Sequence, residues 1–242
     1  MVSGMRAGLI SIIQGLRRRL IGLSGLGLVL VGLSACATAA PPPPPPPPGL
    51  VVGSGEGGRF LRDWRGVIQP QDLDRYQRLD AAWETALRQA RQERGSGSLA
   101  RLGDLLIPSA TLDFVTPPEG SYRCRTIKLG DQSGDGGLAF VVYGWFACKI
   151  ELTPQGLKLT KLTGSQRPSG LFFPENERRL VYLGSMAVAN EPPAESYGEN
   201  PERDLVGVLE RVGERRWRLA IPWPHNESNL DLIELVPVTQ RK

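Results

Sequence analysis

Residues 138–151, LAFVVYGWFACKIE, show most clearly how this chain folds. Every second position from 140 to 150 holds an apolar or small side chain: Phe140, Val142, Gly144, Phe146, Cys148 and Ile150. Alternation with a period of two is typical of a strand that buries one face. We therefore predict a single long strand over residues 138–151.

Comparable segments surround this stretch from Thr116 to the C-terminal region. Short runs rich in Val, Ile, Tyr, Phe and Trp are separated by Pro and Gly, which favours strands joined by turns. We predict about eight strands, over residues 121–129, 138–151, 157–163, 169–173, 179–187, 204–212, 215–221 and 231–238. Short strands at this spacing predict an antiparallel meander, closed into a barrel or stacked as a sandwich.

A helical pattern precedes the strands, over residues 71–94. Its apolar side chains recur at steps of three and four and share one face: Leu73, Tyr76, Leu79, Trp83, Ala86, Leu87 and Ala90. Pro70 suits a first turn and Gly95 suits the end. A second, short helix is predicted over residues 98–106. The predicted fold class is α+β, mainly β, with an N-terminal amphipathic helix packed on the meander.

The N-terminal region predicts export. Four arginines and no acid are followed by 14 apolar or small residues, 20–33, too few for the roughly 20 that a spanning helix needs. The ending Leu33-Ser-Ala-Cys36 resembles the lipobox of bacterial lipoproteins, which implies a signal peptide over 1–35 and lipidation of Cys36. Two alternatives stay open: cleavage after residues 37–39, and an uncleaved anchor helix.

A linker follows the lipobox, over residues 36–58. Eight prolines, 41–48, predict a polyproline II rod of about 25 Å at about 3.1 Å per residue, and residues 49–58 are rich in glycine. We expect a tether that holds a single folded domain, residues 59–242, away from the membrane. Ala37 is not the Asp that favours retention in the inner membrane, so the protein is expected to face the periplasm from the outer membrane.

The charge of the chain is explained by its N-terminal segment. The 29 Lys+Arg exceed the 25 Asp+Glu by four. The four arginines before Cys36 are Arg6, Arg17, Arg18 and Arg19, so the lipidated chain would be neutral overall. Nucleic-acid binding needs a basic excess or a basic face, so we expect no nucleic-acid partner.

Two cysteines remain once Cys36 is assigned to lipid. In an oxidising compartment Cys124 and Cys148 are expected to form a structural disulfide. If the bridge joined residues directly opposite each other, Tyr122 would face Ile150 and Thr126 would face Phe146. A bridge between strands that are not neighbours stays open as an alternative.

Two polar segments are candidate ligand sites. Arg123 and Arg125 share the face opposite Tyr122 and Cys124, where they would bind an anion such as a lipid phosphate, or else pair with surface carboxylates. Ser165, Gln166 and Arg167 link two predicted strands and would line the mouth of a barrel, or else form a turn capped by the arginine.

The sequence offers little for catalysis. One histidine, His225, stands in the whole chain, and no Gly-x-Ser-x-Gly elbow follows the signal. Residues 130–137 hold two acids in a glycine loop that is too short for an EF-hand and lacks its final Glu. We expect no catalytic residue, no metal and no cofactor, although the question of an enzyme stays open.

From about Trp64 onward the chain resembles a bacterial family called domain of unknown function 4893. The resemblance rests on Asp72-x-x-Arg75 and Leu-Asp-x-Ala-Trp83 within the predicted helix, residues 120–130, Phe146-Ala-Cys148, residues 163–167, Tyr182-Leu-Gly184, and Arg216-Trp-Arg-Leu219 before Pro222. It implies no activity, and a calycin-like barrel is a looser analogy. We expect an envelope lipoprotein with a non-catalytic binding or scaffold domain; the alternatives are a barrel-type inhibitor of an exported protease and a hydrolase. Its partner would be an envelope protein or a small ligand.

Overall fold

The computed structural model describes residues 63–93, 96–134 and 138–239. The predicted signal peptide, Cys36 and the whole predicted tether lie outside these residues. Within them, no helix has the length and apolar character needed to cross a membrane.

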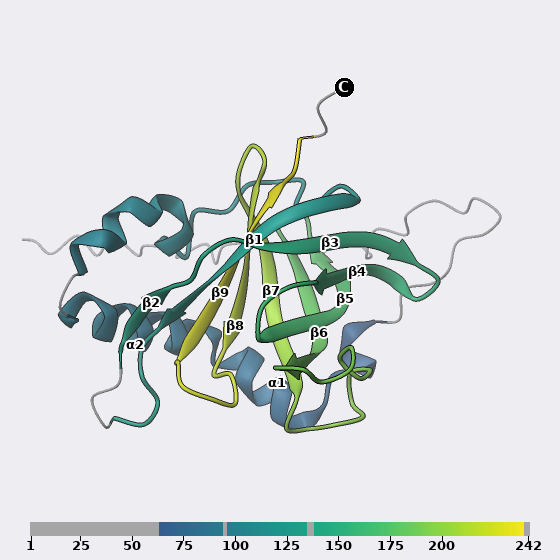
Figure 1. The fold of residues 1–242 in the computed structure, drawn as a ribbon, viewed down its shortest axis with the longest axis horizontal. Coiled ribbons are helices and arrows are strands. Elements are labelled where there is room, and N and C mark those ends of the chain that lie inside the picture. Colours follow the sequence, from purple (N-terminus) through teal and green to yellow (C-terminus); the bar gives the residue numbers. More distant parts are fainter. Residues whose placement is uncertain (1–62, 94–95, 135–137, 240–242) are drawn as a thin grey trace, which may run out of the picture. The chain divides into compact units, whose positions relative to one another are not determined.

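Eight antiparallel strands form a closed barrel (Figure 1). Each strand pairs with the next along the chain, and the first pairs with the last, so the barrel alternative is the one that the structure adopts. The strands of the barrel are β1 (Gly120–Leu129), β3 (Phe146–Thr153), β4 (Gly156–Lys161), β5 (Gln166–Asn176), β6 (Arg179–Val188), β7 (Asp204–Gly213), β8 (Arg216–Pro222) and β9 (Leu230–Pro237).

The predicted strand over residues 138–151 is two strands. β2 (Phe140–Val142) pairs with the end of β1, and β3 pairs with its beginning. Between these two pairings, three residues, 143–145, stand opposite two residues, Arg125 and Thr126. The one extra residue interrupts the pairing of the strands, as in a β-bulge. The predicted apolar face is therefore divided. Phe140 packs under the helices, whereas Phe146, Cys148 and Ile150 face the barrel interior.

The disulfide between Cys124 and Cys148 is confirmed, with a Cα–Cα distance of 5.9 Å. The register predicted from it is wrong by two residues. Cys124 stands opposite Phe146, and Cys148 stands opposite Tyr122, so the bridge runs diagonally across the strand pair. A direct cross-strand bridge was the simplest assumption, but diagonal neighbours are also within disulfide reach.

The barrel interior is packed with apolar side chains. Inward-facing residues from all eight strands form one buried cluster, which includes Leu159, Phe172, Tyr182, Leu209, Trp217, Leu219, Ile233 and Leu235. The Tyr182 ring lies over two glycines of β5 and β6. A Cβ atom at Gly170 would stand 2.8 Å from Tyr182 Cζ, and one at Gly184 would collide with the same ring. These two positions therefore need glycine for close packing, and large side chains occupy the centre of the barrel.

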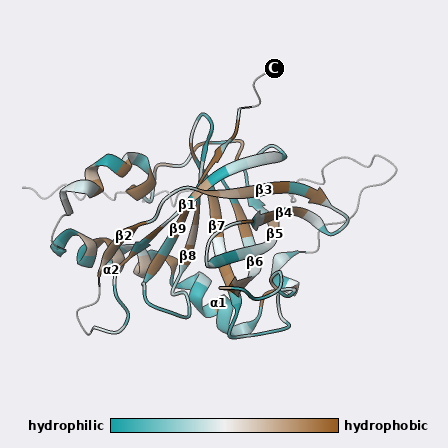
Figure 2. Cartoon of the chain, viewed as in Figure 1, coloured by the Kyte–Doolittle hydropathy of each residue, from teal (hydrophilic) through white to brown (hydrophobic). Residues whose placement is uncertain are grey.

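Helices cover one side of the barrel (Figure 1). They are η1 (Trp64–Gly66), α1 (Pro70–Gln77), α2 (Leu79–Gln92) and the 3₁₀ segment η2 (Ser96–Leu106). The predicted apolar face of α2 is buried against outward-facing residues of the wall, among them Ile127, Leu129, Ala220 and Leu232. Figure 2 shows hydrophobic residues gathered in β7 to β9 and hydrophilic ones along α1. The helices supply a second core outside the barrel.

The predicted helix over residues 71–94 is interrupted at Arg78, whose φ and ψ of −94° and 18° are not helical. No Gly or Pro marks this position. The Trp223 indole N–H, from the loop between β8 and β9, donates to the Arg78 carbonyl at 3.1 Å, and the Arg78 guanidinium lies 5.0 Å from the centre of the indole ring. The predicted short helix over 98–106 is 3₁₀ instead, with a break at Gly103, where φ is 54°.

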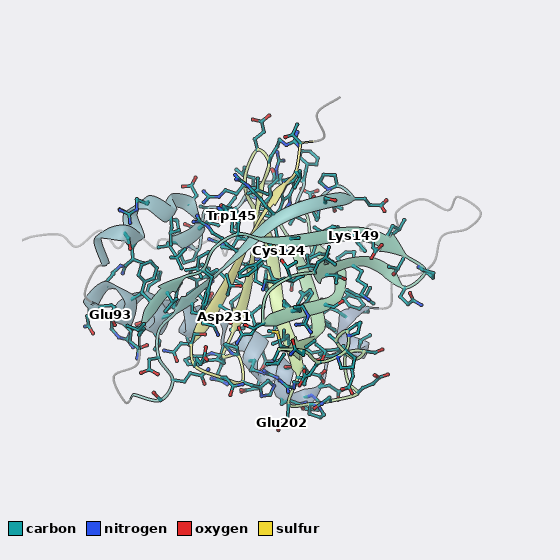
Figure 3. All side chains as sticks on the ribbon, in the orientation of Figure 1. Glu93, Cys124, Trp145, Lys149, Glu202 and Asp231 are labelled. Atoms are coloured by element: carbon teal, nitrogen blue, oxygen red, sulfur yellow. A yellow bond between two sulfur atoms is a disulfide. The ribbon has the colours of Figure 1, made fainter. Side chains whose placement is uncertain are left out.

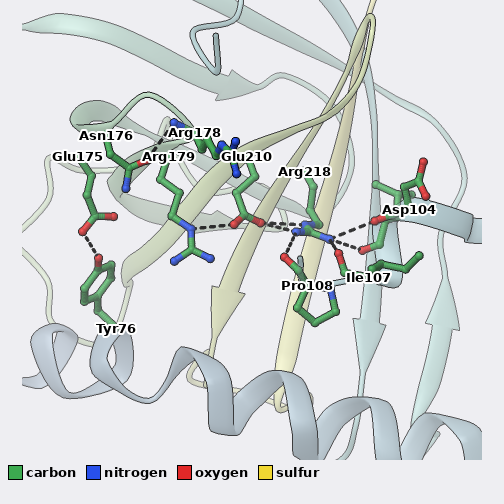
Figure 4. A network of polar contacts seen from close by, with 11 residues as sticks. Tyr76, Asp104, Ile107, Pro108, Glu175, Asn176, Arg178, Arg179, Glu210 and Arg218 are labelled. Carbon is green, nitrogen blue, oxygen red and sulfur yellow. Dashed lines mark hydrogen bonds and ion pairs between the residues drawn. The ribbon is translucent and has the colours of Figure 1, made fainter. Parts of the chain in front are cut away.

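A buried arginine joins the helical layer to the wall (Figure 4). Arg218 of β8 is 0% exposed and donates to the Glu210 carboxylate of β7. It also donates to the carbonyls of Asp104, Leu105, Ile107 and Pro108, and lies 4.8 Å from the centre of the Trp83 ring. One side chain therefore satisfies the carbonyls at the end of η2 and contacts α2 as well.

Candidate functional site

Arg123 and Arg125 meet on one aromatic ring on the outside of the barrel. Their guanidinium carbons lie 4.4 and 4.8 Å from the centre of the Trp145 ring. Trp145 is 41% exposed and precedes β3, in the three residues that interrupt the pairing with β1. The bulge therefore places this indole, labelled in Figure 3, where both arginines contact it.

A carboxylate completes this surface. Glu234 of β9 accepts from Arg125 at 2.5 Å and from Arg216 at 2.6 Å. We call Arg123, Arg125, Trp145, Arg216 and Glu234 the Trp145 surface. It carries three cations and one anion: Arg123 and Arg125 contact the exposed indole, and Glu234 links Arg125 to Arg216. The helices cover Ile127 and Leu129 further along the same face of β1, but leave Arg123 exposed.

The other predicted site residues lie in and beside the turn from β4 to β5. Arg167 donates to the carbonyls of Gly164 at 3.2 Å, Ala189 and Glu191 at 2.8 Å, so it ties this turn to the loop that follows β6. The Ser165 carbonyl accepts from Ala189 N–H at 2.7 Å. The structure brings Arg123 and Arg125 together, but it does not place Arg167 on the same ring.

A polar cluster that the sequence analysis missed lies at the end of the barrel where β1 stops and β9 starts. Lys128 is 6% exposed, and its Nζ lies 2.8 Å from Glu227 and 3.5 Å from Asp231. The Ser228 hydroxyl donates to Asp231. Lys128 shares the interior side of β1 with Cys124, so strand alternation could have drawn attention to it. Figure 3 shows Asp231 well away from Trp145.

Burial disfavours the charged forms of both Lys128 and Asp231. Burial alone would lower the pKa of Lys128, but the Asp231 and Glu227 carboxylates outweigh it and raise the pKa. Burial raises the pKa of Asp231, and contacts with Lys128 and Ser228 offset this only in part. Lys128 therefore stays charged and depends on the carboxylates around it.

A second buried lysine, Lys161 of β4, has no carboxylate beside it in the part of the chain that the structure describes. Its Nζ donates to the Gln166 carbonyl at 2.6 Å and lies 4.0 Å from the centre of the Phe146 ring. Burial first, and then the Arg167 charge, lower its pKa to about 8. Gln166, a predicted ligand residue, is thus engaged through its backbone.

His225 lies exposed in the loop between β8 and β9. Among residues 63–93, 96–134 and 138–239, no hydrogen bond joins its imidazole to a serine or a carboxylate, and no group of three or more His, Cys, Asp or Glu is placed to hold a metal ion. The geometry around the single histidine does not form a triad.

Comparison with known protein families shows which family the chain belongs to. The model of the family described as Domain of unknown function (DUF4893) matches residues 64–235, which span the helices and nearly the whole barrel. The chain belongs to this family. No curated protein and no solved structure matches the chain.

Several residues that carry the likeness have packing roles in this DUF4893 domain. Asp72 and Arg75 form a buried ion pair on α1, and the Tyr197 hydroxyl donates to Asp72 at 2.6 Å. Trp83 stacks on Arg218, and Trp217 Nε1 donates to the Val115 carbonyl at 2.7 Å. These motif residues hold the helices and connecting segments onto the barrel, so they explain the fold of the DUF4893 domain rather than an activity.

Proposed function

We propose that this protein is an envelope lipoprotein. In this account residues 1–35 are the signal peptide, Cys36 carries the lipid, and residues 36–58 form a tether to the outer membrane, with the domain in the periplasm. The basic, apolar and Leu-Ser-Ala-Cys segments support the proposal. At about 0.8 kcal/mol per buried methylene, two or more acyl chains anchor a protein stably.

The Cys36→Ala variant tests the anchor. The wild-type protein is expected in the membrane fraction and to incorporate labelled palmitate, whereas the variant is expected to do neither. Retention of the variant in the membrane fraction after a high-salt wash would contradict the lipid anchor.

We further propose that the folded domain is a non-catalytic binding module that acts through the Trp145 surface. The observation that carries this is Trp145, exposed between Arg123 and Arg125. Trp and Arg dominate binding energy at protein interfaces, and charge complementarity selects the partner. Three arginines against Glu234 favour an acidic segment of another envelope protein.

Site-specific photo-crosslinking in intact cells tests this function. A crosslinker that replaces Ala147, the exposed residue opposite Arg123, is expected to join the protein to an acidic segment, identified by mass spectrometry. Leu152, which is also exposed, is the matched control position and is expected to give a different pattern. Equal crosslinking from both positions to the same segment would refute a specific surface.

A second candidate, an inhibitor of an exported protease, is favoured by Phe114. This side chain is 84% exposed and has a φ of 59°, which is rare for a bulky residue. The backbone on both sides is held, because the Asp113 carbonyl accepts from Arg211 at 3.2 Å and the Val115 carbonyl accepts from Trp217 at 2.7 Å. A rigidly held aromatic side chain suits a protease pocket that accepts aromatic residues.

Inhibition of chymotrypsin by the full chain tests this second candidate. Phe114→Ala is expected to abolish inhibition, and Leu152→Ala is expected to leave it unchanged. Absence of inhibition by the wild-type chain, or equal inhibition by Phe114→Ala, would reject it.

A further inference from the structure

The Lys128 ammonium group has two carboxylate partners, one buried and one exposed. Asp231 is buried on β9, accepts from Ser228, and lies 3.5 Å from Lys128 Nζ. Glu227 is closer, at 2.8 Å, yet its side chain is 62% exposed. An ion pair with an exposed carboxylate contributes little stability, so another anion can compete for Lys128.

The backbone at Glu227 is unusual. Its φ is 72°, in the left-handed region that residues other than glycine rarely adopt. Gln132 holds the loop in place: its N–H donates to the Glu227 carbonyl at 2.8 Å, and its Nε2 donates to the carbonyls of Pro224 and Ser228. Since the backbone is fixed, only the Glu227 side chain needs to rotate to release Lys128. Strain of this kind is often found at binding sites.

A cavity of about 640 Å³ opens beside this ion pair. Its lining includes Lys128, Glu227 and Ser228, and Val141, the cross-strand neighbour of Lys128, forms an apolar part of it with Leu138 and Tyr143. The other lining residues are polar or glycine: Gly130, Asp131, Gln132, Ser133, His225 and Asn226. Its volume is in the range of small-molecule sites, which combine an apolar lining with a few polar groups. A ligand for this cavity would have a small apolar body and one negative charge.

We propose that Lys128 binds the carboxylate of a small amphipathic molecule, and that the Glu227 side chain occupies this position until the ligand displaces it. The apolar body of the ligand lies against Leu138, Val141 and Tyr143. Asp231 and Ser228 keep the ammonium group in place in both states. This site is separate from the Trp145 surface and does not depend on binding of a partner protein there.

Phenylacetate is the probe, and phenylacetamide is its uncharged match. The full-length protein is titrated with each, and ligand-observed NMR gives the dissociation constants. Phenylacetate is expected to bind at least about tenfold more tightly than phenylacetamide, because only the carboxylate can pair with Lys128. Equal affinities would overturn the proposal.

Two variants separate the roles of the charges. Glu227→Gln removes the competitor and is expected to tighten phenylacetate binding by up to about fivefold, the factor equivalent to an exposed ion pair. Lys128→Met is expected to lose binding, and Lys149→Met, at an exposed lysine on β3, is the control. If Lys128→Met fails to fold, the Glu227→Gln variant still tests the proposal. Unchanged or weaker binding of phenylacetate to Glu227→Gln would overturn it.

Discussion

At the scale of single residues, buried cations are the main departure from what the sequence predicts. Alternation along β8 correctly separates Arg216 and Arg218 from Trp217 and Leu219. It does not reveal that the helical layer covers Arg218 and leaves Arg216 half-buried. Lys161 is also buried, on the interior side of β4, where it lies against the Phe146 ring of β3. Burial by a distant segment is a tertiary property, so the local pattern could not indicate it.

Arg218→Met should destabilise the fold strongly. The change leaves Glu210 buried with only Arg179, at 2.9 Å, and removes one hydrogen-bond donor from each of four carbonyls. Breaking a buried pair by removing one partner costs about 3–5 kcal/mol. Urea denaturation measures this loss in the free energy of unfolding. Arg88→Met, which removes an exposed ion pair with Glu84, is the control and should change the free energy of unfolding little. An equally small change for Arg218→Met would contradict the structural role of Arg218.

Lys161 should make stability depend on pH in the alkaline range. Its pKa is about 8 in the folded protein, against an ordinary lysine value of 10.5, so between these values the unfolded chain binds a proton that the folded protein releases. Stability therefore increases as the pH rises from about 8 towards 10.5. Urea unfolding of wild type and Lys161→Met across this range checks the prediction. The difference between the two proteins should change steadily with pH; parallel curves would show that the lysine does not titrate this way.

At the scale of secondary-structure elements, the existence of strands was easier to predict than their registers. The alternation over residues 138–151 is real, but the extra residue between β2 and β3 transfers its apolar side chains from one core to the other. The break at Arg78 depends on Trp223, 145 residues away. Both features arise from contacts between distant elements, which local periodicity does not contain.

The disulfide should stabilise the barrel through β1 and β3. It joins cysteines 24 residues apart, and a loop of this size contributes about 3 kcal/mol in the chain-entropy account of cross-links. The double variant Cys124→Ala, Cys148→Ala is expected to lose about this amount in urea denaturation. Reductant should lower the stability of wild type to a similar extent and leave the double variant unchanged. Loss of stability on adding reductant to the double variant would point to another cause.

At the scale of the whole molecule, the sequence predicted a mainly β domain with an amphipathic helical cover, and closure of the sheet followed from the pairing of β1 with β9. The common face of Arg123 and Arg125 was predictable from alternation. Their shared contact with Trp145 was not, because it depends on the bulge. The Lys128 cluster was missed since Glu227, Ser228 and Asp231 approach β1 only in the folded barrel.

The central claim, that the Trp145 surface binds an acidic partner segment, is tested most directly by charge exchange. The measurement is the dissociation constant between the protein and the segment identified by crosslinking at position 147. Arg123→Glu should weaken binding by more than about tenfold, as should replacing the facing acid of the segment by lysine. Combining both changes should restore most of the affinity, since the opposite charges meet again. The account would be contradicted if the two changes together weakened binding by the sum of their separate losses in binding free energy. It would also be contradicted if Arg123→Glu bound the unchanged segment with full affinity.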